Sequence, residues 1–158
     1  PVTDNADFTV TAGRRYYQMI TIPSVYPQYT ITGIEWKNCT TYTAGDIMCG
    51  IDIIDSLTPT INYTPLACTG AVTAQTNTGS VHVQRNSLIS SVIIPAGTLV
   101  GAWIQCSVAT KVREINSGTY YHKATTYPSP VTPPVIESTS FSTSTGGKYI
   151  KVYYKGYN

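Results

Sequence analysis

The sequence predicts an all-β protein, an antiparallel β-sandwich of jelly-roll-like form, and three observations support this fold class. Short runs of strand length are separated by Gly, Pro, Asn and Ser, a spacing typical of antiparallel sheets. No window keeps a 3.6-residue apolar period over the length of a helix. Charged residues make up only 11% of the 158 residues, and the Thr and Tyr that replace them favour strands.

The first half of the chain contains five predicted strands, at residues 8–11, 16–22, 29–41, 47–54 and 66–75. Gly13 separates the first two strands, and the loop from Pro23 to Pro27 precedes the third. The third strand has Ile31, Ile34 and Trp36 as its expected core anchors. The turn 44–46 leads into the fourth strand, and a Pro- and Asn-bearing crossing over residues 56–65 leads into the fifth.

The second half continues this pattern, with predicted strands at residues 80–85, 88–94, 99–108, 119–123, 135–142 and 148–154. A turn at 77–79 opens the first of these strands, in which Val83 and Gln84 face opposite ways. The near-continuous apolar run 99–108 follows a turn at 95–98, and we expect it to be buried on both faces. The four prolines in 127–134 exclude a central strand and predict an extended loop.

A final hairpin turn is expected at 145–147, where Thr145 precedes two glycines. The sum is about ten to twelve strands, the number found in a β-sandwich or jelly roll. No composition shift marks a domain boundary, so we expect residues 1–158 to form a single domain.

The four cysteines, Cys39, Cys49, Cys68 and Cys106, permit two disulfides in three pairings. Cys49 alternates with Ile47 and Ile51, and Cys106 alternates with Ala102, Ile104 and Val108, so both should point into the core. Buried free thiols are therefore as plausible as bridges. If one local bridge forms, we expect Cys39–Cys49, across a hairpin turn near residues 43–45.

The sequence lacks the residues that several classes of binding site require. The net charge is +2 and the lysines at 148, 151 and 155 are spread along one segment, so we expect no nucleic-acid binding. No apolar stretch approaches the roughly 20 residues of a membrane span, and no phosphate loop or dinucleotide motif predicts a cofactor. Asp4 with Asp7, and Asp52 with Asp55, offer too few oxygens for calcium, so no metal site is predicted.

Catalysis would have to use a small set of groups. A glycoside hydrolase needs two carboxylates facing one cleft, and Glu35, beside Trp36, and Glu114 are the only glutamates placed to do so. Neither has a matching catalytic strand motif, and an ion pair on the surface near Lys37 explains Glu35 more simply. No serine has a nucleophile-elbow context. We therefore expect a protein that is not an enzyme.

Tyrosine is the most informative residue type, with 13 copies against 2 Phe and 2 Trp. Its hydroxyl needs water or a partner, so such enrichment indicates either a stacking surface for sugars, a subunit interface or tyrosines covering sheet edges. The first choice for a ligand site is Tyr120, Tyr121, His122 and Tyr127, beside the Pro-rich loop.

Five segments together resemble the jelly-roll modules of phage tail-fibre and other virion surface proteins. They are Tyr16-Tyr17, the run 31–36 (ITGIEW), the run 49–52 (CGID), the turn 95–98 (PAGT) and the terminal run 149–154 (YIKVYY). The resemblance lies in the order of strands and turns over most of the chain. It implies a trimeric or otherwise repeated assembly that attaches to a host surface, often through glycans.

These observations give one first interpretation and two alternatives. The first is a non-catalytic module of a virion or extracellular surface that binds a host glycan or receptor as a homo-oligomer. The second is a structural subunit that assembles with its own copies, such as a capsid, decoration or filament protein. The third is a small glycoside hydrolase or a carbohydrate-binding module.

Overall fold

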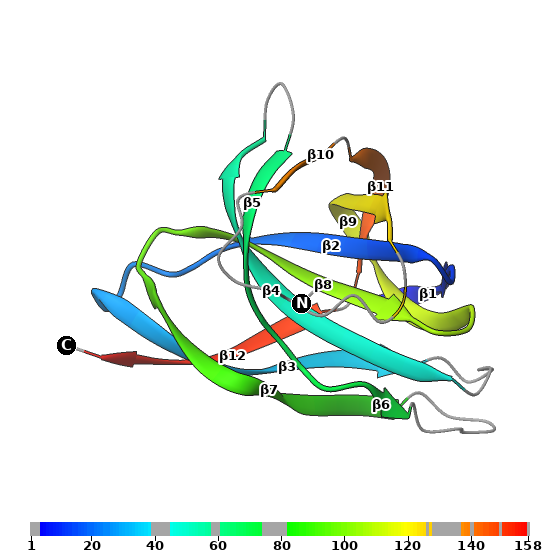
Figure 1. The fold of residues 1–158 in the computed structure, drawn as a ribbon, viewed down its shortest axis with the longest axis horizontal. Coiled ribbons are helices and arrows are strands. Elements are labelled where there is room, and N and C mark those ends of the chain that lie inside the picture. The colour runs from blue at the N-terminus through cyan, green and yellow to red at the C-terminus, as the bar shows by residue number, and fades with distance from the viewer. Residues whose placement is uncertain are drawn as a thin grey trace.

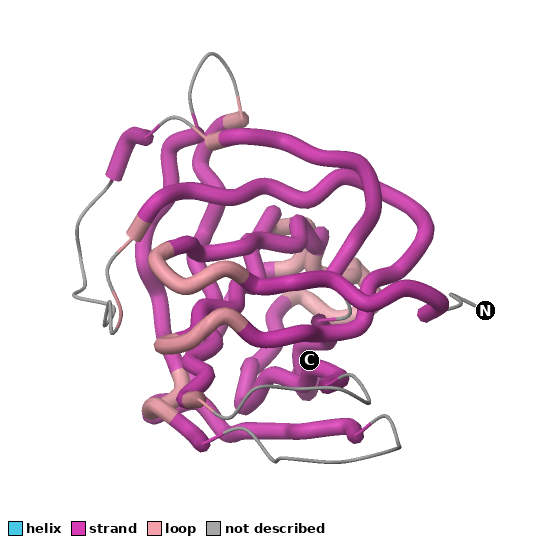
Figure 2. Tube along the Cα trace, turned by 90° about the vertical axis from the view of Figure 1, so that its right-hand side faces the viewer, coloured by secondary structure: helices cyan, strands magenta, loops and turns pink. Residues whose placement is uncertain are grey.

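The chain folds into antiparallel β-strands, which confirms the predicted β-sandwich (Figure 1). The structure is a computed structural model that describes residues 4–38, 45–57, 61–73, 82–125, 127, 137–139, 141–148 and 150–157. Within these ranges there is no helix, as the trace in Figure 2 shows. The strands are β1 (Asp4–Val10), β2 (Arg14–Thr21), β3 (Gln28–Asn38), β4 (Asp46–Ser56), β5 (Ile61–Cys68), β6 (Val72–Thr73), β7 (His82–Pro95), β8 (Leu99–Cys106), β9 (Thr110–Ala124), β10 (Glu137–Thr139), β11 (Ser142–Lys148) and β12 (Ile150–Tyr157).

The strands form two sheets that pack against each other. The larger sheet has the order β10-β5-β4-β8-β2-β9, with β1 and β11 paired to β9 and β6 paired to β4. The smaller sheet has the order β7-β3-β12. A single residue pair, Asn38 with Val112, connects β3 to β9 and so joins the two sheets. The non-sequential order, with β8 between β4 and β2, is of the kind found in Greek-key and jelly-roll sandwiches.

The central strands β4 and β8 are buried on both faces. From Val100 to Cys106 every residue of β8 is buried, as the apolar run predicted, whereas Val108 lies beyond the strand and is exposed. In β4 the residues from Ile47 to Asp52 are all buried. One face of the larger sheet therefore contacts the smaller sheet, and the other face has a separate apolar cover.

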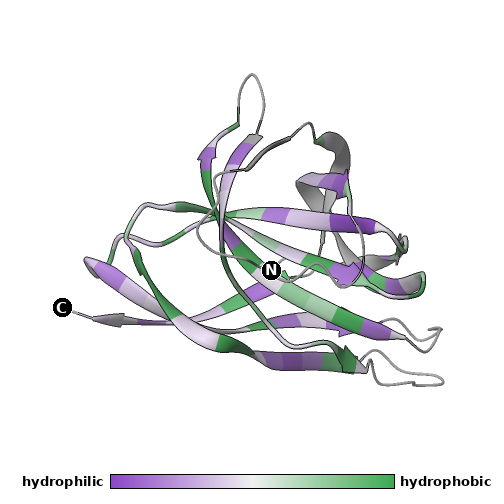
Figure 3. Ribbon diagram, in the orientation of Figure 1, coloured by the Kyte–Doolittle hydropathy of each residue, from purple (hydrophilic) through white to green (hydrophobic). Residues whose placement is uncertain are grey.

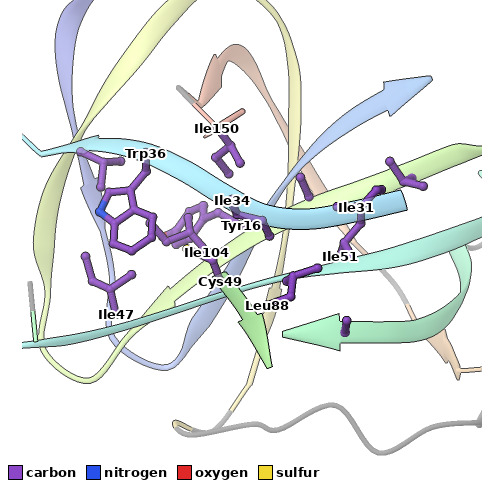
Figure 4. Close-up of a cluster of buried hydrophobic side chains, with 14 of the residues drawn as sticks. Tyr16, Ile31, Ile34, Trp36, Ile47, Cys49, Ile51, Leu88, Ile104 and Ile150 are labelled. Atoms are coloured by element: carbon purple, nitrogen blue, oxygen red, sulfur yellow. The ribbon is translucent and has the colours of Figure 1, made fainter. Parts of the chain in front are cut away.

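The main core lies between the two sheets (Figure 4). Ile31, Ile34 and Trp36 of β3 are fully buried there, as predicted, and they contact the inward side chains of β4 and β8. Ile31 and Ile34 can both point inward because Thr32 is an extra residue of β3 opposite β12, where Ile31 pairs with Tyr154 and Gly33 with Tyr153. Outside this core, hydrophilic and hydrophobic residues succeed one another along most strands (Figure 3).

Three cysteines, Cys49, Cys68 and Cys106, are buried free thiols. This finding agrees with the inward direction predicted for Cys49 and Cys106 and not with a bridge from Cys39 to Cys49. Cys39 itself lies outside the described residues. The two strands that were expected to form the hairpin, β3 and β4, belong to different sheets and do not pair.

Several strand boundaries differ from the predictions because bulges accommodate residues that normally end strands. Pro65 lies inside β5, next to a register shift against β4, so part of the predicted crossing is strand. Thr145 pairs with Thr119 and Gly147 with Ile115, across a bulge in β9, so no hairpin turn forms there. The short strand predicted at 119–123 is the end of the much longer β9.

Other expectations concern the loops and the edge strand β7. Gly13 and Gly97 both have positive φ, at 77° and 74°, in the predicted turns. Val83 and Gln84 face opposite ways in β7, but the polar Gln84 is buried and the apolar Val83 is exposed, the opposite of what hydrophobicity alone suggests. The turn 77–79 and the Pro-rich loop, apart from Tyr127, lie outside the described residues. No helix long and apolar enough to cross a membrane occurs in the described ranges.

Candidate ligand-binding site

The four residues predicted as a ligand site lie on two faces of the larger sheet. Tyr120 is buried in the main core, where its ring lies 5.2 Å from that of Phe8 in an edge-to-face arrangement. His122 is on the same face, with its ring 5.7 Å from the ring of Tyr16. Strand alternation turns Tyr121 to the opposite face.

Tyr121 and Tyr127 both contact the apolar cluster of Tyr17, Met48, Cys68 and Trp103 on that opposite face. Within the described ranges the buried hydroxyl of Tyr127 has no hydrogen-bond partner, and burial raises the pKa of Tyr127 to about 12. The structure thus brings Tyr121 and Tyr127 together and separates them from Tyr120 and His122. A ligand role for these residues stays a prediction.

A buried polar cluster, which we call the Asp52 cluster, lies on the same face of the larger sheet and comprises Arg15, Tyr17, Asp52, Trp103 and Gln105. The carboxylate of Asp52 has no exposed surface. It accepts hydrogen bonds from the Tyr17 hydroxyl and from the indole nitrogen of Trp103, both at 2.9 Å. The Arg15 guanidinium lies 3.8 Å from the Asp52 carboxylate and 3.8 Å above the Trp103 ring.

Burial dominates the electrostatics of the Asp52 cluster. It raises the pKa of Asp52 to about 6, although the charge of Arg15 and the hydrogen bonds from Trp103 and Tyr17 act to lower it. Burial, and then the charge of Asp52, raise the pKa of Tyr17 as well. Because the carboxylate is sealed from solvent, the Asp52 cluster is a structural network and offers no surface to a ligand.

The neighbouring carboxylates considered for calcium are engaged separately. Asp55 accepts a hydrogen bond from the Thr64 hydroxyl at 2.9 Å, and Asp7 forms an ion pair with Arg113 at 2.7 Å. Among the residues that the structure describes, no three His, Cys, Asp or Glu side chains gather as a metal site would require.

Glu35, the carboxylate considered for glycoside hydrolysis, lies on the outer face of β3 under other side chains. It forms ion pairs with Arg85 at 3.2 Å and Lys151 at 3.8 Å, and it accepts a hydrogen bond from the Tyr153 hydroxyl. Burial acts to raise its pKa, but the hydrogen bonds and positive charges outweigh this effect and lower it. A glycosidase acid needs a raised pKa, so Glu35 does not suit that role.

An open groove of about 610 Å³ lies at one end of the sandwich, between the loop after β2 and the end of β12. Its lining residues, which we call the tyrosine groove, are Pro23, Val25, Tyr26, Tyr29, Tyr154, Lys155 and Gly156. In Figure 1 this end carries the C-terminus and the β7–β8 turn. The lining contains three aromatic rings, one cation and no carboxylate.

The rings of the tyrosine groove form a connected set around one buried member. Tyr29 is buried, and its ring makes edge-to-face contacts with Tyr26 at 5.9 Å and with Tyr154 at 5.2 Å. The backbone N–H of Tyr26 donates a hydrogen bond to the Tyr29 hydroxyl at 3.2 Å. Tyr26 and Tyr154 remain 40% and 45% exposed, so both rings offer surface to a ligand.

Backbone contacts hold the loop that carries Tyr26. The N–H of Ala96 donates to the carbonyl of Pro27 at 2.9 Å, and the N–H of Gly97 donates to that of Ile22 at 3.0 Å. Gly156 permits a close approach on the other wall, because a Cβ there would lie 2.2 Å from Cδ2 of the Tyr26 ring. The groove is therefore a preformed surface and does not depend on a free loop.

In the sequence Tyr26 falls within the loop from Pro23 to Pro27, Tyr29 opens the predicted strand 29–41 and Tyr154 ends the run 149–154, and no local pattern connects them. The two walls are separated by more than a hundred residues, and only the pairing of β12 with β3 brings them together. Glycine at 156 next to tyrosines was the one local signal, since glycine in a strand marks a close approach.

Comparison with protein-family models, with curated proteins and with solved structures gave no match for this chain. The function of the chain is therefore inferred from the geometry of the molecule itself.

Proposed function

We propose that this chain is a non-catalytic attachment module of a virion or extracellular surface, and that it binds a glycan in the tyrosine groove. The observation that supports the proposal is the set of exposed rings of Tyr26 and Tyr154, fixed around the buried Tyr29 in an open groove. Such rings present flat faces of negative potential, against which the C–H groups of a sugar ring can stack. The preformed groove limits the entropy lost on binding.

Truncation of the groove tests this proposal. The purified protein is applied to a glycan array, and its best ligand is then titrated calorimetrically against the wild type and the Tyr154→Ala variant. Loss of one stacking interaction, which contributes about 1.4 kcal/mol to the binding free energy, predicts an affinity about tenfold weaker. Val83→Ala is the matched control, because Val83 is an exposed apolar residue at the far end of β7, beside Lys37.

Gly156→Ala provides a second test that leaves every aromatic group in place. The added methyl group meets the Tyr26 ring, so the ring must shift and the groove must change shape. We expect weaker glycan binding with little change in the free energy of unfolding, because Tyr26 is on the surface. Unchanged affinity in both groove variants contradicts the proposed site, and the absence of binding to any glycan contradicts the proposed function.

The self-assembling structural subunit has one observation in its favour. Edge strand β7 exposes Ile89 and Ile93, which are 73% and 64% accessible. Residues 88–91 of β7 lie opposite the single residue 32 of β3, and this bulge bends β7 (Figure 1). Mass measurement in solution tests this alternative: polymers that are lost in an Ile89→Lys variant, without any glycan binding, favour it over attachment.

A further inference from the structure

The positive charge of the molecule is concentrated on the smaller sheet. Strands β3, β7 and β12 carry Lys37, Arg85, Lys151 and Lys155 against the single carboxylate of Glu35, a net charge of +3. The whole chain has a net charge of only +2, so the remainder is slightly negative. The uneven distribution gives one face of the molecule a positive potential.

The strand register places these cations on the outer face that leads away from the tyrosine groove. Lys151 pairs with Glu35 and Lys155 pairs with Thr30, so the two lysines share the outward side of β12. They are four residues apart, a separation of about 13 Å along an extended strand. Between them lies Tyr153, whose ring is stacked 3.7 Å from the Arg85 guanidinium. The guanidinium of Arg85, which comes from β7, thus lies with Lys151 and Lys155 in a row along β12.

Lys155 connects this row to the groove. It is an exposed lining residue and the only charged member of the lining. Its amine lies 5.4 Å from the centre of the Tyr157 ring, a cation–π contact within β12. A sugar ring stacked on the exposed Tyr154 would lie next to Lys155 in the lining, with further cations beyond it on the outer face of β12.

From this arrangement we infer that the ligand of the tyrosine groove is an acidic glycan, one that bears carboxylate or sulfate groups. The inference depends on the proposed glycan-binding function. Stacking on tyrosine selects the sugar ring, and Lys155 pairs with an acidic group on that ring or on its neighbour. The next acidic sugars extend along β12 toward Lys151 and Arg85, which are 59% and 60% exposed at their side chains. No bond is made or broken.

The test uses four glycan probes in two matched pairs, hexagalacturonic acid with its methyl ester and dextran sulfate with dextran. Single-stranded DNA serves as a general polyanion for comparison. Affinities are measured calorimetrically at low and at physiological salt, because ion pairing weakens with ionic strength. We expect one acidic member to bind at least tenfold more tightly than its neutral counterpart. The member that does so identifies carboxylate or sulfate as the preferred group.

The variants separate charge from stacking. Lys155→Gln should weaken binding of the acidic probe at least fivefold and leave the neutral probe unchanged, and Lys155→Arg should retain the affinity. Lys111→Gln is the matched control, an exposed strand lysine on β9 outside the smaller sheet. Tyr154→Ala should weaken the acidic and the neutral probe alike.

Each contrary result has a distinct meaning. Equal affinity for acidic and neutral probes, lost in Tyr154→Ala, keeps glycan binding and overturns the inference of an acidic ligand. Binding of single-stranded DNA as strongly as the acidic probes, unaffected by Tyr154→Ala, indicates attraction of any polyanion and also overturns it. If none of the probes and no glycan on the array binds, the proposed function fails and the inference fails with it.

Discussion

Replacing the buried Asp52 with asparagine is expected to change how stability depends on pH. The folded-state pKa of Asp52 is raised to about 6, from an ordinary value of 3.8, with burial as the largest cause. The folded protein therefore binds a proton at pH 5 that the unfolded chain does not bind. A group of this kind adds stability as the pH falls through its folded pKa, and withdraws it as the pH rises.

The magnitude follows from the two pKa values. At pH 7 the carboxylate is ionised in both states and contributes almost nothing to the pH dependence. A pH of 5 is one unit below the folded-state pKa of Asp52 and above its unfolded-state pKa. This difference corresponds to about 1.4 kcal/mol of added stability. Asp52→Asn cannot titrate, so its free energy of unfolding should lack this gain.

At pH 7 the loss of the negative charge should not by itself destabilise Asp52→Asn, because the raised folded-state pKa means that folding favours a neutral group over the carboxylate at this position, even with Arg15 nearby. Urea unfolding followed by tryptophan fluorescence measures the free energy of unfolding of both proteins, since Trp36 and Trp103 are fully buried in the native state. Titrations shared by both proteins cancel in the comparison.

The free energy of unfolding of the wild type minus that of Asp52→Asn should rise by about 1.4 kcal/mol between pH 7 and pH 5. A difference that stays constant or falls refutes the reasoning. If the variant does not fold, a carbon-detected NMR titration of the wild type reads the Asp52 carboxyl directly. A midpoint at or below 3.8, the ordinary value, then contradicts the raised pKa.

Gly50→Ala places a Cβ 2.1 Å from the Trp103 ring, so it should lower the free energy of unfolding measured in urea by about 3 kcal/mol. Gly70→Ala, which has open space around its Cβ, should change that free energy by under about 0.5 kcal/mol. Equal effects of the two substitutions contradict the close packing of Gly50 against Trp103. Burial raises the pKa of Cys49 and raises that of Cys106 to about 11. An aromatic disulfide reagent at pH 8 should therefore label both thiols at least a hundredfold faster in the urea-unfolded protein than in the native protein. Rapid labelling of the native protein contradicts this prediction.

Sequence pattern predicted the strands well where local chemistry decides them. The apolar run of β8, the anchors Ile31, Ile34 and Trp36, and the turns at Gly13 and Gly97 depend on alternation and on backbone freedom, and all of these can be read within a few residues. The pattern was misleading where a bulge intervenes. A bulge admits Pro65 into β5, and nothing in the local sequence distinguishes such a bulge from a loop.

The candidate site was harder to predict because it depends on pairing between distant strands. Tyr120 is of a residue type expected in a ligand site, but alternation along β9 directs its side chain into the core. Asp52 is of a type expected in a metal site or a turn, and only the long-range pairs of β4 and β2 with β8 bring it to Trp103 and Tyr17. Local composition cannot show which faces of two strands become neighbours.

The distance in sequence between the two walls of the tyrosine groove affects the synthesis of the protein. Tyr29 leaves the ribosome long before Tyr154, and more than a hundred residues at about 5–20 residues per second correspond to a delay on the order of ten seconds. A nascent or truncated chain that ends before β12 lacks half of the groove and one edge of the smaller sheet. The proposed glycan binding would therefore require β12, and incomplete products that lack this strand would not compete for the ligand.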